Sequence, residues 1–149
     1  MDRLGYSFHA GVPCSILRDV IAGLEARGGY VAAAREDLAV GFAAGAALAG
    51  RKAALYMQNS GLCVASNALA SLSLLYEIPA LLVVSWRGHG PDAPEHALTG
   101  ALTPDLFRLL GIPFRVLDPE GWEGQLIETD GEIGRTRRPA GLLVRKGVL

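Results

Sequence analysis

A carboxyl group at the start of an apolar segment is the first candidate for chemistry. Glu36 and Asp37 follow three alanines and Arg35, and they precede a stretch rich in alanine and glycine that continues to Leu48. One interpretation is electrostatic, because acidic side chains stabilise the positive end of a helix dipole. The other is chemical, because a carboxyl group among small apolar residues can share a proton with a ligand nitrogen. The pattern leaves both interpretations open.

A second candidate is the polar run Gln58-Asn59-Ser60-Gly61, which follows an apolar segment over residues 53–57. The run could form a turn and cap a helix, or it could offer hydrogen bonds to a ligand beside a helix N-terminus. The chain contains no Gly-Lys-Ser/Thr phosphate-binding loop and no G-x-G-x-x-G dinucleotide fingerprint. Both of these nucleotide-binding motifs are therefore excluded.

The third candidate is a long polar segment over residues 86–99. It contains an arginine, two histidines and two acids: Arg87, His89, Asp92, Glu95 and His96. A solvated loop, a metal site and an active-site loop all remain open, although the histidine spacing fits no zinc pattern, so no metal ligand is assigned. In an active site, Arg87 would contact an anion and a histidine would donate a proton.

The fourth candidate segment is an early turn, Gly11-Val12-Pro13-Cys14-Ser15. Cys14 and Cys63 have neither the spacing of metal ligands nor that of a disulfide framework. Both are expected to be small buried side chains. A thiol near a helix start could react, but no histidine-containing motif supports a cysteine nucleophile at Cys14.

Composition narrows the function classes. The chain has 149 residues, of which 50% are hydrophobic and 19% charged, with a net charge of −1. This excludes intrinsic disorder and gives no electrostatic attraction to nucleic acid or anionic membranes. The apolar stretch over residues 53–86 is interrupted by polar residues and Pro79, and the start lacks a signal-peptide core, so a cytoplasmic protein is expected. The excess of apolar residues could form a core or a face for a partner.

Short apolar runs alternate with helix-like segments, which predicts one α/β domain over residues 1–149. Strands are expected at 6–10, 30–33, 53–57, 80–85, 114–117 and 141–145. Helices are expected at about 15–27, 35–48, 62–76, 103–110 and 120–135, with Ser15 and Thr103 as N-caps. Continuous apolar strands favour a doubly wound, mainly parallel sheet with helices on both faces. The four candidate segments would then share one rim of the sheet.

The same segments carry a resemblance to a known family. Taken in order, they resemble the pyrimidine-binding domain of thiamine-diphosphate-dependent decarboxylases, and most closely sulfopyruvate decarboxylase alpha subunits and phosphonopyruvate decarboxylases. The resemblance covers about residues 11–113. It rests on Gly11-Val12-Pro13-Cys14-Ser15, Glu36 with its alanine-rich stretch, Met57-Gln58-Asn59-Ser60-Gly61-Leu62, Asn67-Ala68-Leu69, Ile78-Pro79, Ser85-Trp86-Arg87-Gly88, Pro94-Glu95-His96 and Gly111-Ile112-Pro113.

The resemblance implies roles for individual residues. Glu36 corresponds to the glutamate that bonds N1′ of the cofactor's aminopyrimidine, and His96 to a histidine that protonates the reaction intermediate. The implied cofactor contacts are Glu36, Gln58, Asn59 and Ser60. The implied substrate contacts are Arg87, His89 and Ser15, of which Arg87 and His89 would hold a sulfonate or phosphonate. Cys63 and the segment 88–92 depart from the family pattern.

The resemblance also implies a partner. Related enzymes bind the diphosphate through Mg²⁺ with a Gly-Asp-Gly motif and a downstream Asn, whereas this chain has only Thr129-Asp130-Gly131. Diphosphate and Mg²⁺ are therefore expected on a separate beta subunit, in an α2β2 or larger assembly, and the chain alone should be inactive. The expected substrate is a small anionic 2-oxo acid. Two alternatives stay open: a split thiamine-diphosphate carboligase and a non-catalytic flavodoxin-like binding or regulatory domain.

Overall fold

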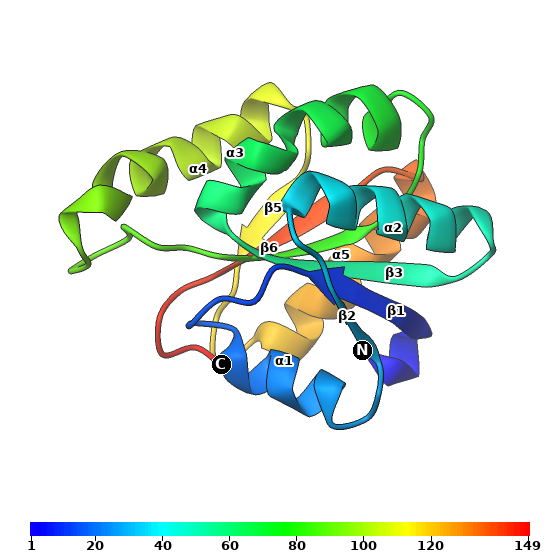
Figure 1. Cartoon of the computed structure of the whole chain (residues 1–149), viewed down its shortest axis with the longest axis horizontal. Coiled ribbons are helices and arrows are strands. Elements are labelled where there is room, and N and C mark those ends of the chain that lie inside the picture. The colour runs from blue at the N-terminus through cyan, green and yellow to red at the C-terminus, as the bar shows by residue number, and fades with distance from the viewer.

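The computed structural model describes residues 1–149 and contains one six-stranded sheet (Figure 1). The strands are β1 (Tyr6–Gly11), β2 (Tyr30–Ala32), β3 (Lys52–Gln58), β4 (Leu81–Ser85), β5 (Phe114–Val116) and β6 (Ala140–Val144). All neighbouring strands are parallel, in the order β2-β1-β3-β4-β6-β5. The predicted α/β class with a doubly wound parallel sheet is confirmed, and each expected strand is present.

Five α-helices connect the strands: α1 (Arg18–Glu25), α2 (Glu36–Leu48), α3 (Asn59–Ala68), α4 (Ala97–Leu109) and α5 (Trp122–Thr136). Three short segments complete the chain: η1 (Asp2–Leu4), the π-helix η2 (Leu69–Leu74), which continues α3, and η3 (Pro94–His96), which leads into α4. None of the helices combines the length and the apolar character that crossing a bilayer requires.

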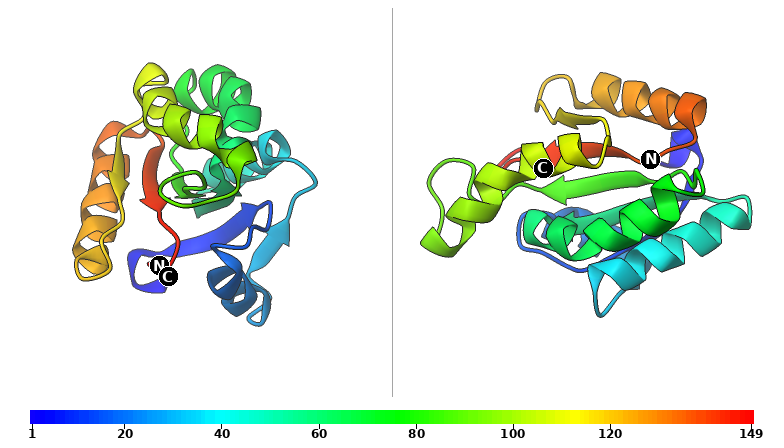
Figure 2. Two further views of the ribbon diagram at one scale, coloured as in Figure 1. Left: turned by 90° about the vertical axis from the view of Figure 1, so that its left-hand side faces the viewer. Right: turned by 90° about the horizontal axis from the view of Figure 1, so that it is seen from above.

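The helices form a layer on each face of the sheet (Figures 1 and 2). Helices α2, α3 and α4 cover one face, and α1 and α5 cover the other. Crossovers between parallel strands are right-handed, so connections that run in opposite directions along the sheet must cover opposite faces. The connections that run back along the sheet, β1 to β2 and β5 to β6, contain α1 and α5, which explains why these two helices share a face.

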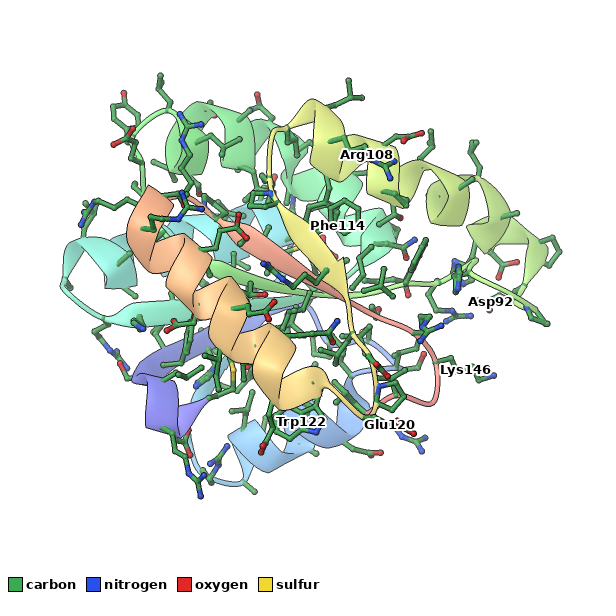
Figure 3. The ribbon with its side chains drawn as sticks, turned by 180° about the vertical axis from the view of Figure 1, so that it is seen from behind. Asp92, Arg108, Phe114, Glu120, Trp122 and Lys146 are labelled. Atoms are coloured by element: carbon green, nitrogen blue, oxygen red, sulfur yellow. The ribbon has the colours of Figure 1, made fainter.

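Each layer has its own core. On the α2 face, Leu55, Met57 and Leu82 of the sheet pack against small residues of α2, such as Ala39 and Ala43. On the other face, the core contains Tyr56, Leu142 and Ile133, the last of these from α5. Figure 3 shows α5 crossing this second face, with Trp122 at its start. Burial of such side chains contributes roughly 1.5–3 kcal/mol each, so the two cores hold the strand ends in fixed positions.

The predicted start of α4 is wrong. Thr103 was expected to cap a helix, but α4 already begins at Ala97 and contains Pro104 in its interior. A proline inside a helix lacks the N–H that would bond the carbonyl four residues earlier. That carbonyl belongs to Gly100, and it accepts a 2.8 Å hydrogen bond from Nε1 of Trp86 instead. A tertiary contact therefore satisfies the group that the proline leaves free.

Two other helix starts differ from the prediction. Helix α1 begins at Arg18 with no side-chain cap, so Ser15 does not cap it. Helix α3 begins at Asn59, directly after β3, without an intervening turn. The extended backbone of Gln58 serves as the N-cap position, again with no side-chain cap. Ser15 and Gln58 thus keep their side chains available for other contacts.

The expectation that both cysteines are buried is wrong for Cys63. Helix α3 buries Asn59, Gly61, Leu62 and Ala65 against its neighbours. Cys63 therefore falls on the outer side of this helix and is exposed. Cys14 is half-buried, with its Sγ 3.2 Å from the Ser85 Oγ at the end of β4.

Candidate active site

The candidate segments gather at one rim of the sheet. Because all six strands are parallel, the segments after β1, β2, β3 and β4 leave the sheet on the same side. The connections that leave the neighbouring strands β1 and β3 run in opposite directions along the sheet and cover opposite faces, and ligands of doubly wound sheets bind at such points. The predicted clustering along this rim is confirmed.

Glu36 is the first residue of α2 and lies across the start of α3. A Cβ atom at Gly61 would stand only 2.5 Å from the Cδ and the Cγ of Glu36. The glutamate side chain thus occupies the space that any other residue at position 61 would fill. The Glu36 carboxylate is partly buried and makes no hydrogen bond or ion pair within the chain. Its oxygens remain available to a ligand at the rim.

Asp37 serves the helix-dipole role that was one interpretation of the acidic pair. Its Oδ1 accepts a 2.9 Å hydrogen bond from the Leu38 amide at the start of α2. Arg35 also donates to this carboxylate, with Nη2 2.9 Å from Oδ2. The hydrogen bond from Arg35, assisted by the Leu38 amide, lowers the pKa of Asp37 below its ordinary value. The two adjacent acids thus differ, since only Asp37 is satisfied within the chain.

Asn59 is a buried junction between three elements. Its side chain is 1% exposed, and its Nδ2 donates to the Arg87 carbonyl and to the Thr103 Oγ1, each at 2.9 Å. The Arg87 amide donates back to Oδ1 of Asn59 at 3.2 Å. Thr103 in turn donates to the Thr99 carbonyl at 2.6 Å. Asn59 therefore fixes the end of β4 and α4 relative to α3, and both of its donor hydrogens are used within the protein.

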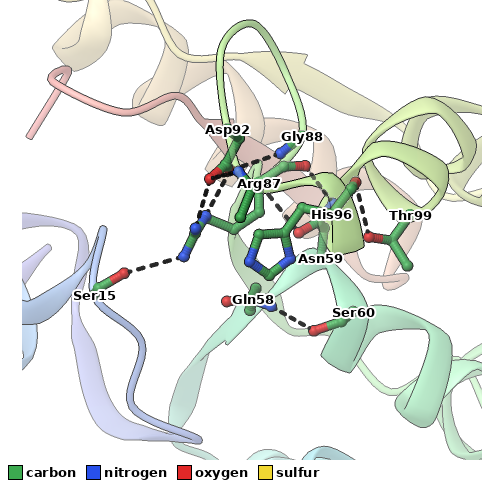
Figure 4. A network of polar contacts seen from close by, with 10 residues as sticks. Ser15, Gln58, Asn59, Ser60, Arg87, Gly88, Asp92, His96 and Thr99 are labelled. Atoms are coloured by element: carbon green, nitrogen blue, oxygen red, sulfur yellow. Dashed lines mark hydrogen bonds and ion pairs between the residues drawn. The ribbon is translucent and has the colours of Figure 1, made fainter.

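Gln58, Ser60 and His96 lie close together on the α3 side of the rim (Figure 4). The Gln58 Nε2 donates to the Ser60 Oγ at 2.7 Å. His96 ends η3 directly before α4, and its ring points toward Gln58 and Arg87 in Figure 4. The ring makes no hydrogen bond within the chain, and all three side chains are partly buried. These three side chains can therefore donate hydrogen bonds to a ligand beside the start of α3 and accept hydrogen bonds from it.

Arg87 is held by Asp92 in a two-pronged ion pair. Nε and Nη2 of Arg87 donate to Oδ2 and Oδ1 of Asp92, each at 2.6 Å (Figure 4). The amides of Gly88 and Ala93 donate to the same carboxylate at 2.9 Å. The hydrogen bonds from Arg87, together with those from the amides, hold the pKa of Asp92 far below its ordinary value. Arg87 keeps one terminal nitrogen outside this pair, and its Nη1 lies 3.4 Å from the Ser15 Oγ.

His89 lies on the outer side of the same loop. Its ring stacks on the indole of Trp86 with centroids 4.1 Å apart and planes inclined by 23°. His89 itself is exposed, and its ring makes no hydrogen bond. The structure thus places Arg87 and Ser15 in contact, whereas the His89 ring packs on Trp86.

The first histidine of the chain is remote from these groups. His9 of β1 is 4% exposed and lies with Tyr56 in the core on the α1 and α5 face. Its Nδ1 is 3.0 Å from the Tyr56 hydroxyl. Burial lowers the pKa of His9 below its ordinary value. The His9–Tyr56 pair is therefore part of the packing beneath the rim.

Three residues that the sequence analysis named build the site through contacts that it did not predict. Gly61 gives Glu36 its space, Asp92 orients Arg87, and Thr103 completes the bonds of Asn59. Gly61 was expected in a turn before a helix, and its place inside α3, where glycine is unfavourable without a packing reason, appears only in the structure. No group of three or more His, Cys, Asp or Glu side chains comes together in the arrangement of a metal site.

Comparison with known proteins gives close relatives. The sulfopyruvate decarboxylase subunit alpha of Methanothermobacter thermautotrophicus is 42% identical over 118 residues, which span 77% of this chain and 72% of that protein. The same subunit of Methanococcus maripaludis is 42% identical, with coverage of 74% and 68%. Phosphonopyruvate decarboxylase of Streptomyces hygroscopicus is 34% identical over the whole chain, which spans only 39% of that enzyme. No protein-family model matches the chain.

Solved structures show the same fold at low sequence identity. A protein from Mycobacterium smegmatis, assigned as a thiamin diphosphate-dependent enzyme, matches 99% of this chain with a TM-score of 0.74 and 16% identity, over 29% of its own length. The 2-oxoglutarate:ferredoxin oxidoreductase of Magnetococcus marinus matches 97% of this chain with a TM-score of 0.67 and 23% identity, over 27% of its length. The identity and coverage of the two alpha subunits show that this chain belongs to the sulfopyruvate decarboxylase alpha-subunit family.

Proposed function

We propose that this chain is the alpha subunit of a thiamine-diphosphate-dependent decarboxylase that converts sulfopyruvate or phosphonopyruvate to the corresponding aldehyde and CO2. The observation that carries the proposal is the Glu36 carboxylate, which lies over Gly61 without a partner in the chain. Membership in the alpha-subunit family supports it. The proposal divides the site between two chains, with the diphosphate and Mg²⁺ on a beta subunit.

The residues at the rim fit an aminopyrimidine. A carboxyl group without protein partners can bond a ring nitrogen, and the bare backbone of Gly61 leaves Glu36 in place to do so. Gln58 and Ser60 add hydrogen-bonding groups beside the start of α3. We assign cofactor contact to Glu36, Gln58 and Ser60. Asn59 was also expected to touch the cofactor, and we propose that it contributes by fixing Arg87 and α4, since its donors are already used.

Each chain residue then has a defined task in the reaction. When bound, thiamine diphosphate supplies an electron sink for the carbon–carbon bond that breaks on decarboxylation. Glu36 shares a proton with the pyrimidine nitrogen and so sets the protonation state of the ring. Arg87, with Ser15 and His89 nearby, holds the anionic substrate. His96, whose ring faces the same space, delivers a proton to the product carbon.

The exposed face of α2 has the composition of a subunit interface. Leu38, Phe42 and Leu48 are large apolar residues on this helix, and Leu48 is 77% exposed. Positions 41 and 45 are glycines with no atom within 4 Å of where a Cβ would stand. An apolar helix with open glycines allows another backbone to approach closely, and permanent interfaces are apolar. We propose that the beta subunit covers this face.

Co-expression with a beta-type chain that carries Gly-Asp-Gly and a downstream Asn tests the function. We expect a stable complex that releases aldehyde and CO2 from sulfopyruvate or phosphonopyruvate only with thiamine diphosphate and Mg²⁺, and no turnover by the alpha chain alone. A condensed product with little free aldehyde would assign the chain to a carboligase. Failure to bind any beta-type chain would favour the alternative that this chain is a non-catalytic binding or regulatory domain.

A further inference from the structure

A cleft opens on the α1 side of Arg87, next to the proposed reaction site. Its volume is about 470 Å³, and it lies between the loop after β1, the loop after β4 and the segment after β6. The charged and hydroxyl side chains that line it are Ser15, Arg18, Asp19, Arg87, Asp92 and Lys146. Arg87 belongs both to this cleft and to the network around Asn59. The cleft is thus joined to the site by a shared residue.

The charges in the cleft leave one cation unmatched. Arg18 and Asp19 form an ion pair at 3.3 Å, and Arg87 and Asp92 form the bidentate pair. Lys146 lines the same cleft and makes no ion pair or hydrogen bond with the rest of the chain. Among the side chains of the cleft, each carboxylate is therefore matched by an arginine, and the Lys146 ammonium group is the surplus positive charge.

The Arg87–Asp92 pair decides which part of the guanidinium faces the cleft. Asp92 takes Nε and Nη2, and it is itself fixed by two backbone amides. The remaining terminal nitrogen, Nη1, is directed to the Ser15 hydroxyl across the cleft, as Figure 4 shows. The guanidinium cannot rotate without losing two charge-assisted hydrogen bonds, so the direction of Nη1 is fixed before any ligand arrives.

We propose that this cleft binds the anionic tail of the substrate, a sulfonate or phosphonate group, between the Arg87 Nη1, the Ser15 hydroxyl and the Lys146 ammonium group. This assignment rests on the proposed function for its substrate, and it adds Lys146 as a specificity-determining residue and Asp92 as a positioning residue. A tetrahedral group with three terminal oxygens has one acceptor for each of the three donors. A 2-oxo acid without such a tail makes none of these contacts.

Kinetics with a matched pair of substrates test the assignment. In the complex with a beta-type chain, Lys146→Gln should raise KM for sulfopyruvate about tenfold, as expected for loss of one charged contact, and should leave kcat/KM for pyruvate within about twofold. Asp92→Asn should raise KM for sulfopyruvate with little change in kcat. Arg138→Gln, which removes an exposed positive charge before β6 at the opposite rim, is the control. Equal effects on both substrates, or none with Lys146→Gln, overturn the assignment.

A direct binding measurement separates this inference from the proposed reaction. Inorganic sulfate titrated into the isolated 149-residue chain should shift the side-chain NMR signals of Arg87 and Lys146, and Lys146→Gln should weaken the affinity while Arg138→Gln does not. If sulfate binds in this way but no complex decarboxylates any 2-oxo acid, the anion cleft stands and the proposed reaction fails. If turnover occurs but sulfate leaves both signals unchanged, the cleft assignment fails and the reaction stands.

Discussion

Two parts of the rim are built in opposite ways. Arg87 itself is bonded within the chain, since Asn59 bonds its backbone and Asp92 bonds its guanidinium. Around Glu36, the carboxylate has no partner and rests on a glycine. A buried or half-buried polar group without a partner destabilises the fold, so it persists where a ligand completes it. The first part positions its residues in advance, and the second leaves a group ready for a ligand.

The largest effect is expected at the unsatisfied carboxylate. Glu36→Gln keeps the shape of the side chain but cannot exchange a proton, so kcat/KM of the complex should fall by about 10³-fold. The thermal unfolding midpoint should stay close to that of the wild type. Asp37→Asn is the control, because this neighbouring carboxylate bonds Arg35 and the Leu38 amide. Near-normal turnover of Glu36→Gln would remove Glu36 from the mechanism.

The next largest effect tests whether Gly61 is what leaves Glu36 in place. Gly61→Ala puts a Cβ 2.5 Å from the Glu36 Cδ and must displace the carboxylate. Displacement of a reacting group by about 1 Å costs on the order of 100-fold in rate, which steady-state kinetics would measure.

Gly124→Ala is the matched control in α5, where a Cβ meets no atom within 4 Å. This variant should keep full activity and gain about 0.5–1 kcal/mol of unfolding free energy, because alanine favours a helix more than glycine does. Full activity of both variants would show that the position of Glu36 does not depend on Gly61.

A smaller effect is expected from breaking the satisfied network. Thr103→Val leaves one Nδ2 hydrogen of the buried Asn59 without an acceptor, which should lower the unfolding free energy by about 1–3 kcal/mol in urea denaturation. Thr103→Ser keeps the hydroxyl and should restore most of the loss. If both variants unfold like the wild type, the hydrogen bonds around Asn59 do not stabilise the fold, and the contrast between the Arg87 region and the Glu36 region is wrong.

The smallest effect is expected from acid. The pKa of Asp92 is lowered in the fold from its ordinary value of 3.8, mainly by the hydrogen bonds from Arg87. The ion pair therefore stabilises the fold at pH values above the ordinary pKa of Asp92. This contribution is lost as the pH falls through the lower pKa that Asp92 has in the folded protein. Between about pH 5 and 2, the urea midpoint of the wild type should fall more steeply than that of Asp92→Asn. Identical slopes would mean that the pair adds nothing to stability.

The sequence predicted the sheet better than the helix starts. Continuous apolar runs such as residues 81–85 mark strands buried on both faces, and these runs are read locally. The start of α4 was misplaced because Thr103 was expected as an N-cap, whereas the helix begins at Ala97. Pro104 is accommodated inside α4 because the Gly100 carbonyl accepts a hydrogen bond from Trp86, which lies outside the helix. Helix limits that depend on tertiary hydrogen bonds cannot be read from local patterns.

For the candidate site too, local features could be predicted from the sequence and tertiary contacts could not. The residue types after each strand predicted the rim and its candidates, because parallel strands end on one side. The partners of these candidates could not be predicted. The contact between Glu36 and Gly61 depends on how α2 packs on α3, and the Arg87–Asp92 pair depends on the fold of a loop whose composition resembles solvated surface. The exposed position of Cys63 likewise depends on which face of α3 is buried.

The attachment of the loop after β4 has a consequence for how the site opens. The indole of Trp86 bonds the Gly100 carbonyl, and the Arg87 backbone bonds Asn59. At Gly100, a Cβ would stand 2.6 Å from the Gly88 carbonyl carbon, so the loop and α4 are in direct backbone contact. This loop cannot swing as an independent lid, because opening it would break partly buried hydrogen bonds to α3 and α4. In the proposed complex with a beta subunit, we expect substrate access to depend on motion between the two chains. The hydrogen-bonded amides of Trp86, Arg87, Gly88 and Ala93 should then exchange slowly throughout turnover.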